Sequence, residues 1–214
     1  IQTVLAGQRD WFESDFRMRS YNGSYRWIHS KGKVLETDSA GHAKRLIGIH
    51  IDVTESKLHE QALQTSEERF RRLMAQSPLS IQIHGLDGKL VESNAAFAKL
   101  FGLNEESLQE VYKKYNILRD EQAKQLGILS CIQQVYEGED VIFPAFEYNG
   151  IDTLKTLNIR NPVSKRCWVQ TRGFQLKDSQ GNITSAVFLS VDITENKRAE
   201  QRLSDYQSRL KRLA

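Results

Sequence analysis

Apolar and polar residues alternate in several short stretches of this chain, which is the pattern of half-buried β-strands. In the first part of the chain the alternating stretches are residues 12–19 and 25–31. Asn22-Gly23 lies between them and is a strong signal for a hairpin turn. A third strand is expected over residues 46–51, after the turn at residues 38–41.

A second group of alternating stretches predicts further strands. They cover residues 79–84, 90–93, 141–148, 167–176 and 183–193. In the first of them Ile81 and Ile83 share one side, and Asp87-Gly88 forms the turn that follows. In the last of them Phe188 and Ser190 lie on one face, and both faces are partly apolar. One face should therefore meet a core and the other a helix or a partner.

Three short helical segments separate these strands. Asn94 is placed to cap a helix over residues 95–101 that ends at Gly102, and Asn104 to cap a helix over residues 105–111. Asp120 opens a third helical stretch, which Gly127 interrupts and which ends at Gly138. Residues 151–162 show no clear period, so an irregular connection is expected there.

Two longer helices are expected over residues 55–73 and from Glu195 to the end of the chain. In the second, apolar residues recur at spacings of four and three: Ala199, Leu203, Tyr206, Leu210 and Leu213. This is the seam of a coiled coil, through which two copies of the chain would form a homodimer. A single amphipathic helix that lies back on its own sheet is the alternative. The first helix has a weaker seam at Leu63, Ser66, Phe70 and Leu73.

The end of the first group of strands is repeated at the end of the second. Residues 52–63 and 192–203 agree at seven of twelve positions, at an offset of 192 − 52 = 140. The match extends backwards to Trp27 and Trp168. A repeat of this length is a whole domain rather than a solenoid unit. Because the first copy lacks a front half, the chain is expected to be a fragment of a longer protein.

Composition narrows the class of protein. The net charge is +3 and 27% of residues are charged, with both signs mixed, so no nucleic-acid partner is expected. The two cysteines, Cys131 and Cys167, have no metal-ligand spacing and fit a reducing compartment. No apolar run of about 18 residues exists, so we expect no membrane contact by this segment and a cytoplasmic location, within either a soluble or a membrane-anchored protein.

The order of elements resembles the PAS domain of sensory proteins. The residues that carry the resemblance are Ser66-Glu-Glu-Arg-Phe70, Ser77-Pro78, Asp87-Gly88, Asn94, Phe97, Phe101-Gly102, and the motifs Asp52-Val-Thr54 and Asp192-Ile-Thr194. The resemblance implies an α+β fold, with a five-stranded antiparallel sheet and helices on one face. It divides the chain into the C-terminal part of a first PAS domain (1–54), a linker helix (55–73), a complete second PAS domain (66–194) and a C-terminal helix (195–214).

The Asp-x-Thr motif also has a physical interpretation. Thr54 and Thr194 lie where a strand becomes a helix, so each hydroxyl is expected to cap free N–H groups of the helix. The PAS resemblance implies that Asp52, Thr54, Asp192 and Thr194 couple the sheet to the helix that carries the signal. A plain helix cap without signalling is the alternative.

No catalytic constellation is present in the sequence, so this part of the protein is not expected to be an enzyme. The five histidines lack ligand spacing, and no metal site is expected. The resemblance argues against haem, since residues 121–136, ahead of the third strand, contain no histidine. It also argues against a flavin–cysteine adduct, since Cys131 lacks the required motif. Any other cofactor stays unknown, and a noncovalent flavin or a small acid stays open.

The PAS resemblance further implies a cup between sheet and helices that could hold a small molecule. The candidate wall is Ile81, Ile83, Phe97, Leu100, Phe101, Cys131, Phe146, Trp168, Thr171, Phe188 and Ser190. The same residues could simply be the packed core of the domain. We therefore expect a sensory module that passes a conformational change to an output module, with a ligand-free dimerisation scaffold and a flavin redox sensor as alternatives. The resemblance implies that the full-length protein is a histidine kinase or a nucleotide cyclase.

Overall fold

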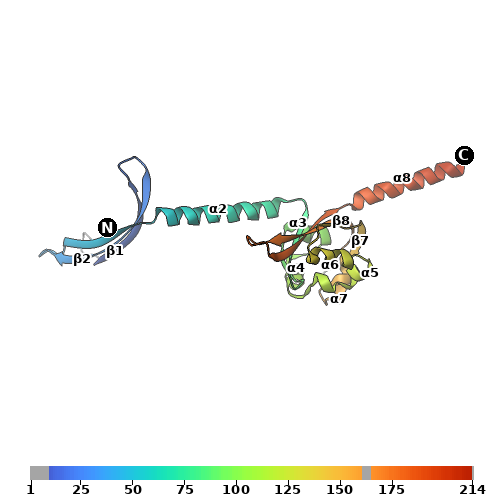
Figure 1. The fold of residues 1–214 in the computed structure, drawn as a ribbon, viewed down its shortest axis with the longest axis horizontal. Helices are drawn as coiled ribbons and strands as arrows, with labels where there is room; N and C mark the ends of the chain where they lie inside the picture. Colours follow the sequence, from blue (N-terminus) through green and yellow to red (C-terminus); the bar gives the residue numbers. More distant parts are fainter. Residues whose placement is uncertain (1–9, 161–164, 214) are drawn as a thin grey trace. The chain divides into compact units, whose positions relative to one another are not determined.

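The computed structural model describes residues 10–160 and 165–213, and the side chains of residues 210–213 are outside the described part. The chain divides into two compact units, residues 1–70 and residues 71–214. Each unit has its own antiparallel sheet (Figure 1).

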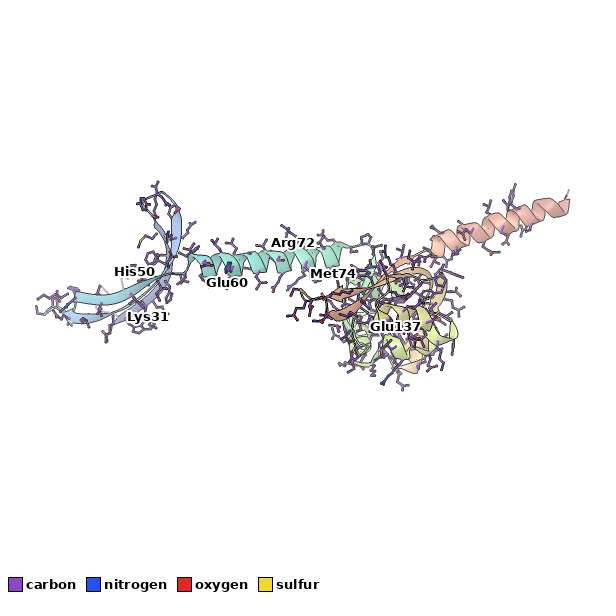
Figure 2. All side chains as sticks on the ribbon, in the orientation of Figure 1. Lys31, His50, Glu60, Arg72, Met74 and Glu137 are labelled. Atoms are coloured by element: carbon purple, nitrogen blue, oxygen red, sulfur yellow. The ribbon has the colours of Figure 1, made fainter. Side chains whose placement is uncertain are left out.

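The first unit contains a three-stranded sheet in the order β1-β2-β3. Its strands are β1 (Trp11–Arg19), β2 (Tyr25–Thr37) and β3 (Ala43–Asp52). The predicted hairpin is present, with Gly23 at φ 88° in the left-handed conformation that glycine adopts without strain. Helix α2 (Thr54–Gln76) follows β3 and has one buried residue, Met74 (Figure 2).

The second unit contains a sheet in the order β5-β4-β9-β8-β6, and β7 also pairs with β8. The strands are β4 (Ser80–Gly85), β5 (Leu90–Ser93), β6 (Val141–Ile142), β7 (Phe146–Asn149), β8 (Arg166–Lys177) and β9 (Ile183–Asp192). All pairings are antiparallel. The predicted α+β class is confirmed.

The strand predicted over residues 141–148 is broken into β6 and β7. Phe146 lies four positions after Ile142, whereas their partners on β8, Val169 and Arg172, are three positions apart. Pro144 lies in this gap and has no N–H to donate to a ladder. The prediction of one continuous strand over residues 141–148 was therefore wrong.

The helical segments between β5 and β6 follow the predicted caps. They are α3 (Ala95–Phe101), α4 (Glu105–Lys114), the 3₁₀ turn η1 (Ile117–Arg119), α5 (Glu121–Gln125) and α6 (Leu129–Glu137). The Asn94 side chain accepts a hydrogen bond from the Phe97 N–H, and Gly102 ends α3 at φ 64°. Asn104 caps α4 in the same way, through the Ser107 N–H.

Residues 151–162 are not wholly irregular, which corrects the prediction for this stretch. Helix α7 (Gly150–Thr156) forms there, with the Asn149 side chain accepting from the Ile151 N–H. Leu154 and Ile159 are buried in the same core cluster as Phe97. A seven-residue helix capped by Asn149 is too short for its period to show in the sequence. Residues 161 and 162 lie outside the described part.

The helices of the second unit cover one face of its sheet, where the largest core cluster joins Ile132 and Val135 of α6 to Ala186 and Phe188 of β9. Helix α8 (Thr194–Leu213) continues from the end of β9 (Figure 1). None of the helices in the described ranges is long and apolar enough to cross a membrane.

Candidate functional site

A cavity of about 80 Å³ lies between the covered face of the second sheet and the helices. Strands β4, β8 and β9 supply its floor, and residues from α3 to α7 supply its walls. Six of the predicted wall residues line it: Phe97, Phe101, Phe146, Thr171, Phe188 and Ser190.

The structure places Ile81 and Ile83 outside the cavity, so the prediction chose the wrong face of β4. Ser80, Gln82 and His84 are the buried residues of that strand. The isoleucines pair with Leu189 and Val187 on the opposite face of the sheet. Because that face is also apolar, alternation alone could not show which side of β4 faces the helices.

Three other predicted wall residues also lie outside the cavity lining. Leu100 is buried in a separate cluster with Cys167 and Val169. Cys131 is partly buried against the main core cluster, next to the cavity wall residue Ile132, but does not itself line the cavity. Trp168 lies on the opposite face of β8, where the Lys197 ammonium is 5.9 Å from the centre of its ring.

A buried carboxylate is the main polar feature of the cavity. Asp120 is 6% exposed, and its Oδ1 accepts hydrogen bonds from the backbone N–H groups of Gln122 (2.9 Å) and Ala123 (3.2 Å). Its Oδ2 accepts from the hydroxyls of Tyr115 (2.8 Å) and Tyr148 (2.7 Å). Burial is the main cause that raises the pKa of both tyrosines well above its usual value, and the nearby charge of Asp120 adds to it, so they keep their protons.

Gln82 brings a second polar group to the cavity floor. His84 Nδ1 lies 3.2 Å from the Gly88 carbonyl oxygen, so Nδ1 carries the proton and donates it. Burial lowers the pKa of His84 to about 4, so the ring is neutral and Nε2 is an acceptor. Nε2 lies 3.3 Å from the atom of the Gln82 amide that is placed as its oxygen. Because Nε2 is an acceptor, we assign the amide in the opposite orientation, with its NH₂ group toward Nε2. Gln82 lines the cavity floor.

Two hydroxyls complete the floor. Thr171 Oγ1 and Ser190 Oγ are 2.8 Å apart on paired positions of β8 and β9, and both are buried. The sequence indicated these two residues but missed Asp120, Tyr115, Tyr148 and Gln82 as cavity residues. The sequence indicated Asp120 only as a helix cap, and in the structure it does cap α5.

The two Asp-x-Thr junctions have the same geometry. Thr54 Oγ1 accepts a hydrogen bond from the Trp27 N–H at 2.8 Å, and the Thr54 N–H donates to Asp52 Oδ1 at 3.0 Å. In the second copy the Thr194 Oγ1 accepts from the Trp168 N–H at 2.9 Å, and the Thr194 N–H donates to Asp192 at 2.9 Å.

The structure corrects the predicted role of the threonine hydroxyl at each junction. It does not cap the helix; it binds the neighbouring strand, and the aspartate receives the first N–H of the helix instead. Hydrogen bonds from the Thr54 hydroxyl and N–H, together with Arg26, lower the pKa of Asp52 to about 2. For Asp192, burial acts to raise the pKa, but the hydrogen bonds from Thr194 outweigh it and leave the pKa below its usual value.

The predicted seams of both long helices are exposed where their side chains are described. In α8 Leu203 and Tyr206 are 59% and 62% exposed, and Ala199 is exposed as well. Leu210 and Leu213 belong to the same helix, but their side chains are outside the described part. In α2 the exposed apolar residues are Leu58, Leu63, Phe70 and Leu73.

No cluster of histidine, cysteine or carboxylate side chains that could hold a metal ion occurs among the described residues.

Comparison with known proteins agrees with this architecture. Two family models, both described as PAS fold, match residues 1–50 and residues 74–198. The second match covers more than half of the chain, and the chain therefore belongs to the PAS fold family.

Among curated proteins, the chain is similar to Sensor protein FixL of Bradyrhizobium diazoefficiens, with 30% identity over 51% of this chain and 21% of that protein. It is also similar to Two-component sensor PprA of Pseudomonas aeruginosa, with 24% identity over 90% of this chain and 19% of that protein. The chain spans about a fifth of the length of the curated relatives it matches.

Solved structures with a similar fold include the PAS domain of an HTR-like protein from Haloarcula marismortui, with a TM-score of 0.45 and 18% identity over 64% of this chain and 99% of that one. The PAS domain of BvgS from Bordetella pertussis has a TM-score of 0.42 and 18% identity, over 68% of this chain and 98% of that one.

Proposed function

We propose that this chain is the sensory and relay part of a signal-transduction protein. A small molecule or a partner acts on the cup of the second unit, and the Asp-x-Thr junction passes the change to α8. The curated relatives named above are sensors, which supports a sensory role.

The observation that carries the proposal is the short path from cavity to helix. Val169 and Ser190 line the cavity. Their close neighbours along the same strands, Trp168 and Asp192, hold Thr194 at the start of α8. A shift of β8 or β9 by a cavity occupant therefore acts on the first residue of the helix without crossing a loop.

The relay needs two states that differ by only a few kcal/mol, with the signal binding one of them better. The contacts at the junction are of this size, since each is a single hydrogen bond worth about 1 kcal/mol. Their rearrangement is therefore within reach of a small ligand.

Dimerisation is the second part of the proposal. In α8 the exposed residues Ala199, Leu203 and Tyr206 recur at spacings of four and three, as in a coiled coil. In α2 the exposed residues Leu63 and Phe70 are one heptad apart, and Leu73 follows three positions later. A parallel homodimer would bury them and would carry a change at Thr194 to an output module. We propose a histidine kinase or a nucleotide cyclase of the diguanylate cyclase kind for the full-length protein, acting in the cytoplasm.

Substitution at the second junction tests the relay. In the full-length protein, Asp192→Ala or Thr194→Ala should abolish the change in output on stimulation while the domain stays folded. Thr194→Ser keeps the hydroxyl and is the matched control, which should respond as the parent does. An unchanged response in both alanine variants would contradict the coupling role.

A ligand-free dimerisation scaffold is the rival function, and the exposed seam of α2 favours it. Native mass spectrometry of the gently purified chain separates the two proposals, because a retained small molecule would argue against the scaffold. An absorption spectrum with flavin bands would instead support the redox sensor.

A further inference from the structure

The Asp120 carboxylate lies in the cavity wall without a positively charged partner. All four of its contacts are donors: two backbone N–H groups and two tyrosine hydroxyls. Four donors and no acceptor are the surroundings of an ionised carboxylate. No ion pair of Asp120 occurs among the described residues, so a negative charge is buried there with no counter-charge.

The rest of the cavity lining does not balance this charge. Among the lining residues in the described ranges there is no lysine, arginine or histidine. His84 lies behind Gln82 and is neutral. Because Coulomb interactions are strong where water is excluded, such a cavity repels an anion and attracts a cation.

Aromatic side chains surround the same space. Seven of them line the cavity: Phe97, Phe101, Tyr115, Phe143, Phe146, Tyr148 and Phe188. Aromatic rings attract cations through their faces, and groups of rings bind alkylated ammonium ions. The four hydrogen bonds of Asp120 already use the roughly four lone-pair sites of a carboxylate. A ligand with N–H donors therefore gains little there, whereas an alkylated ammonium needs only the charge and the rings.

The size of the cavity limits the ligand. The cavity measures about 80 Å³. On the same volume scale, one water needs roughly 10–15 Å³. The space therefore suits a molecule of about five to eight heavy atoms.

We infer that this cavity selects a compact alkylated ammonium ion over neutral or anionic molecules of the same shape. This inference rests on the proposed function, in which the cavity takes a small molecule. It adds the chemical class of that molecule and assigns its recognition to Asp120 and the surrounding rings.

Three probes of nearly equal shape test the inference on the 214-residue chain: choline, its neutral carbon isostere 3,3-dimethylbutan-1-ol, and the anion 3,3-dimethylbutanoate. Isothermal titration at pH 7.5 should give a Kd for choline at least about tenfold lower than for the alcohol. The anion should show no binding. Equal or tighter binding of the alcohol or the anion would overturn the inference, as would binding of none of the three at millimolar concentration.

Asp120→Asn assigns the effect to the carboxylate. The amide oxygen can still accept the two backbone N–H groups, so the cap of α5 is kept. Choline affinity should fall at least about tenfold, while affinity for the alcohol changes by less than about threefold. Asp140→Asn removes the same charge at an exposed site paired with Arg172 and should leave all three affinities unchanged. Unchanged choline affinity in Asp120→Asn would overturn the assignment, and if that variant does not fold, the three probes on the parent chain decide.

The inference about the ligand class and the proposal of a small-molecule relay are contradicted by different results. If the alcohol or the anion binds best, charge selection is wrong but the cavity still takes a small molecule. If choline binds without any response at Thr194 or in the output, the ligand class is right and the relay is wrong.

Discussion

The sheets of the two units end in the same junction but differ in what covers them. Strands β2 and β3 pair Ile28 with Asp52, and β8 and β9 pair Val169 with Asp192, in the same register. Every residue of β3 except Ala43 is exposed, including His50, whose ring lies 5.9 Å from that of Phe16 (Figure 2). In β9, by contrast, Phe188 is 1% exposed and Ser190 is 2% exposed.

The Asp-x-Thr junction is therefore a local structure that needs no packed cavity beside it. Three short contacts, from Trp N–H to Thr hydroxyl, from Thr N–H to Asp, and from Thr hydroxyl to Asp, define it in both copies. The second unit differs because a cavity lies against its two junction strands, β8 and β9. Four predictions, from the largest effect to the smallest, separate these contributions.

Removing a large side chain should matter only where the sheet is covered. Phe188→Ala deletes a buried ring that contacts His84 and Phe143, and should lower the free energy of unfolding of the second unit by about 3–5 kcal/mol. Ile49→Ala removes an exposed side chain from β3 and should change stability by less than about 0.5 kcal/mol. Urea unfolding measures both, and equal effects would show that the two sheets do not differ in this way.

Acid should weaken the second unit through His84. Its pKa is about 4 when folded and 6.5 in the reference state, so the unfolded chain takes up the proton first as pH falls. The contribution is fully present above pH 6.5 and is lost as pH falls toward 4, to a total of about 3 kcal/mol. Unfolding at pH 5 should need about 2 kcal/mol less than at pH 7.5. His84→Gln should flatten this dependence, and a variant with the same pH profile as the parent would refute the assignment.

Loss of the threonine hydroxyl should have the same effect at both junctions. Thr54→Val and Thr194→Val each remove the acceptor of a tryptophan N–H, at a cost of about 1 kcal/mol. Amide hydrogen exchange at Trp27 and at Trp168 should speed up several-fold in the corresponding variant, and serine should restore protection. A large difference between the copies would mean that the cavity, and not the motif, holds the junction.

The smallest expected effect is the acid titration of the junction. The pKa of Asp52 is about 2, below its reference value of 3.8, so its contribution is present above pH 3.8 and is lost as pH falls toward 2. Carboxyl carbon chemical shifts should show both Asp52 and Asp192 titrating below the reference value of 3.8. Titration of either residue near its reference value would argue against the hydrogen bonds described here.

Local chemistry in the sequence predicted most of the second unit. Asn94 and Gly102 define α3, and Asn22-Gly23 defines a hairpin, because each residue acts on its own backbone. Features that depend on tertiary contacts were harder to predict from the sequence. The inner face of β4 carries Ser80, Gln82 and His84, and His84 contacts the carbonyl of the Gly88 turn, a partner that no strand pattern reveals.

The candidate site shows the same difference between features set by local sequence and features set by tertiary contacts. Phe188 and Ser190 were predicted to share one face of β9, and both line the cavity, because alternation fixes which residues of a strand share a face. From the sequence, Asp120 was predicted only as the start of a helix. Its place in the cavity depends on Tyr148, which is 28 residues away, and such a pairing needs the fold.

The most direct test of the account is whether the cavity and the second junction are coupled. Ile132→Val removes one methyl group from the helical wall of the cavity, far along the chain from Trp168, and leaves the unit folded at a cost of about 1 kcal/mol. In the 214-residue chain, the backbone amide resonances of Trp168 and Thr194 should shift, and that of Trp27 should stay in place. Resonances that move only around Ile132, with Trp168 and Thr194 unchanged, would contradict the relay from cavity to helix.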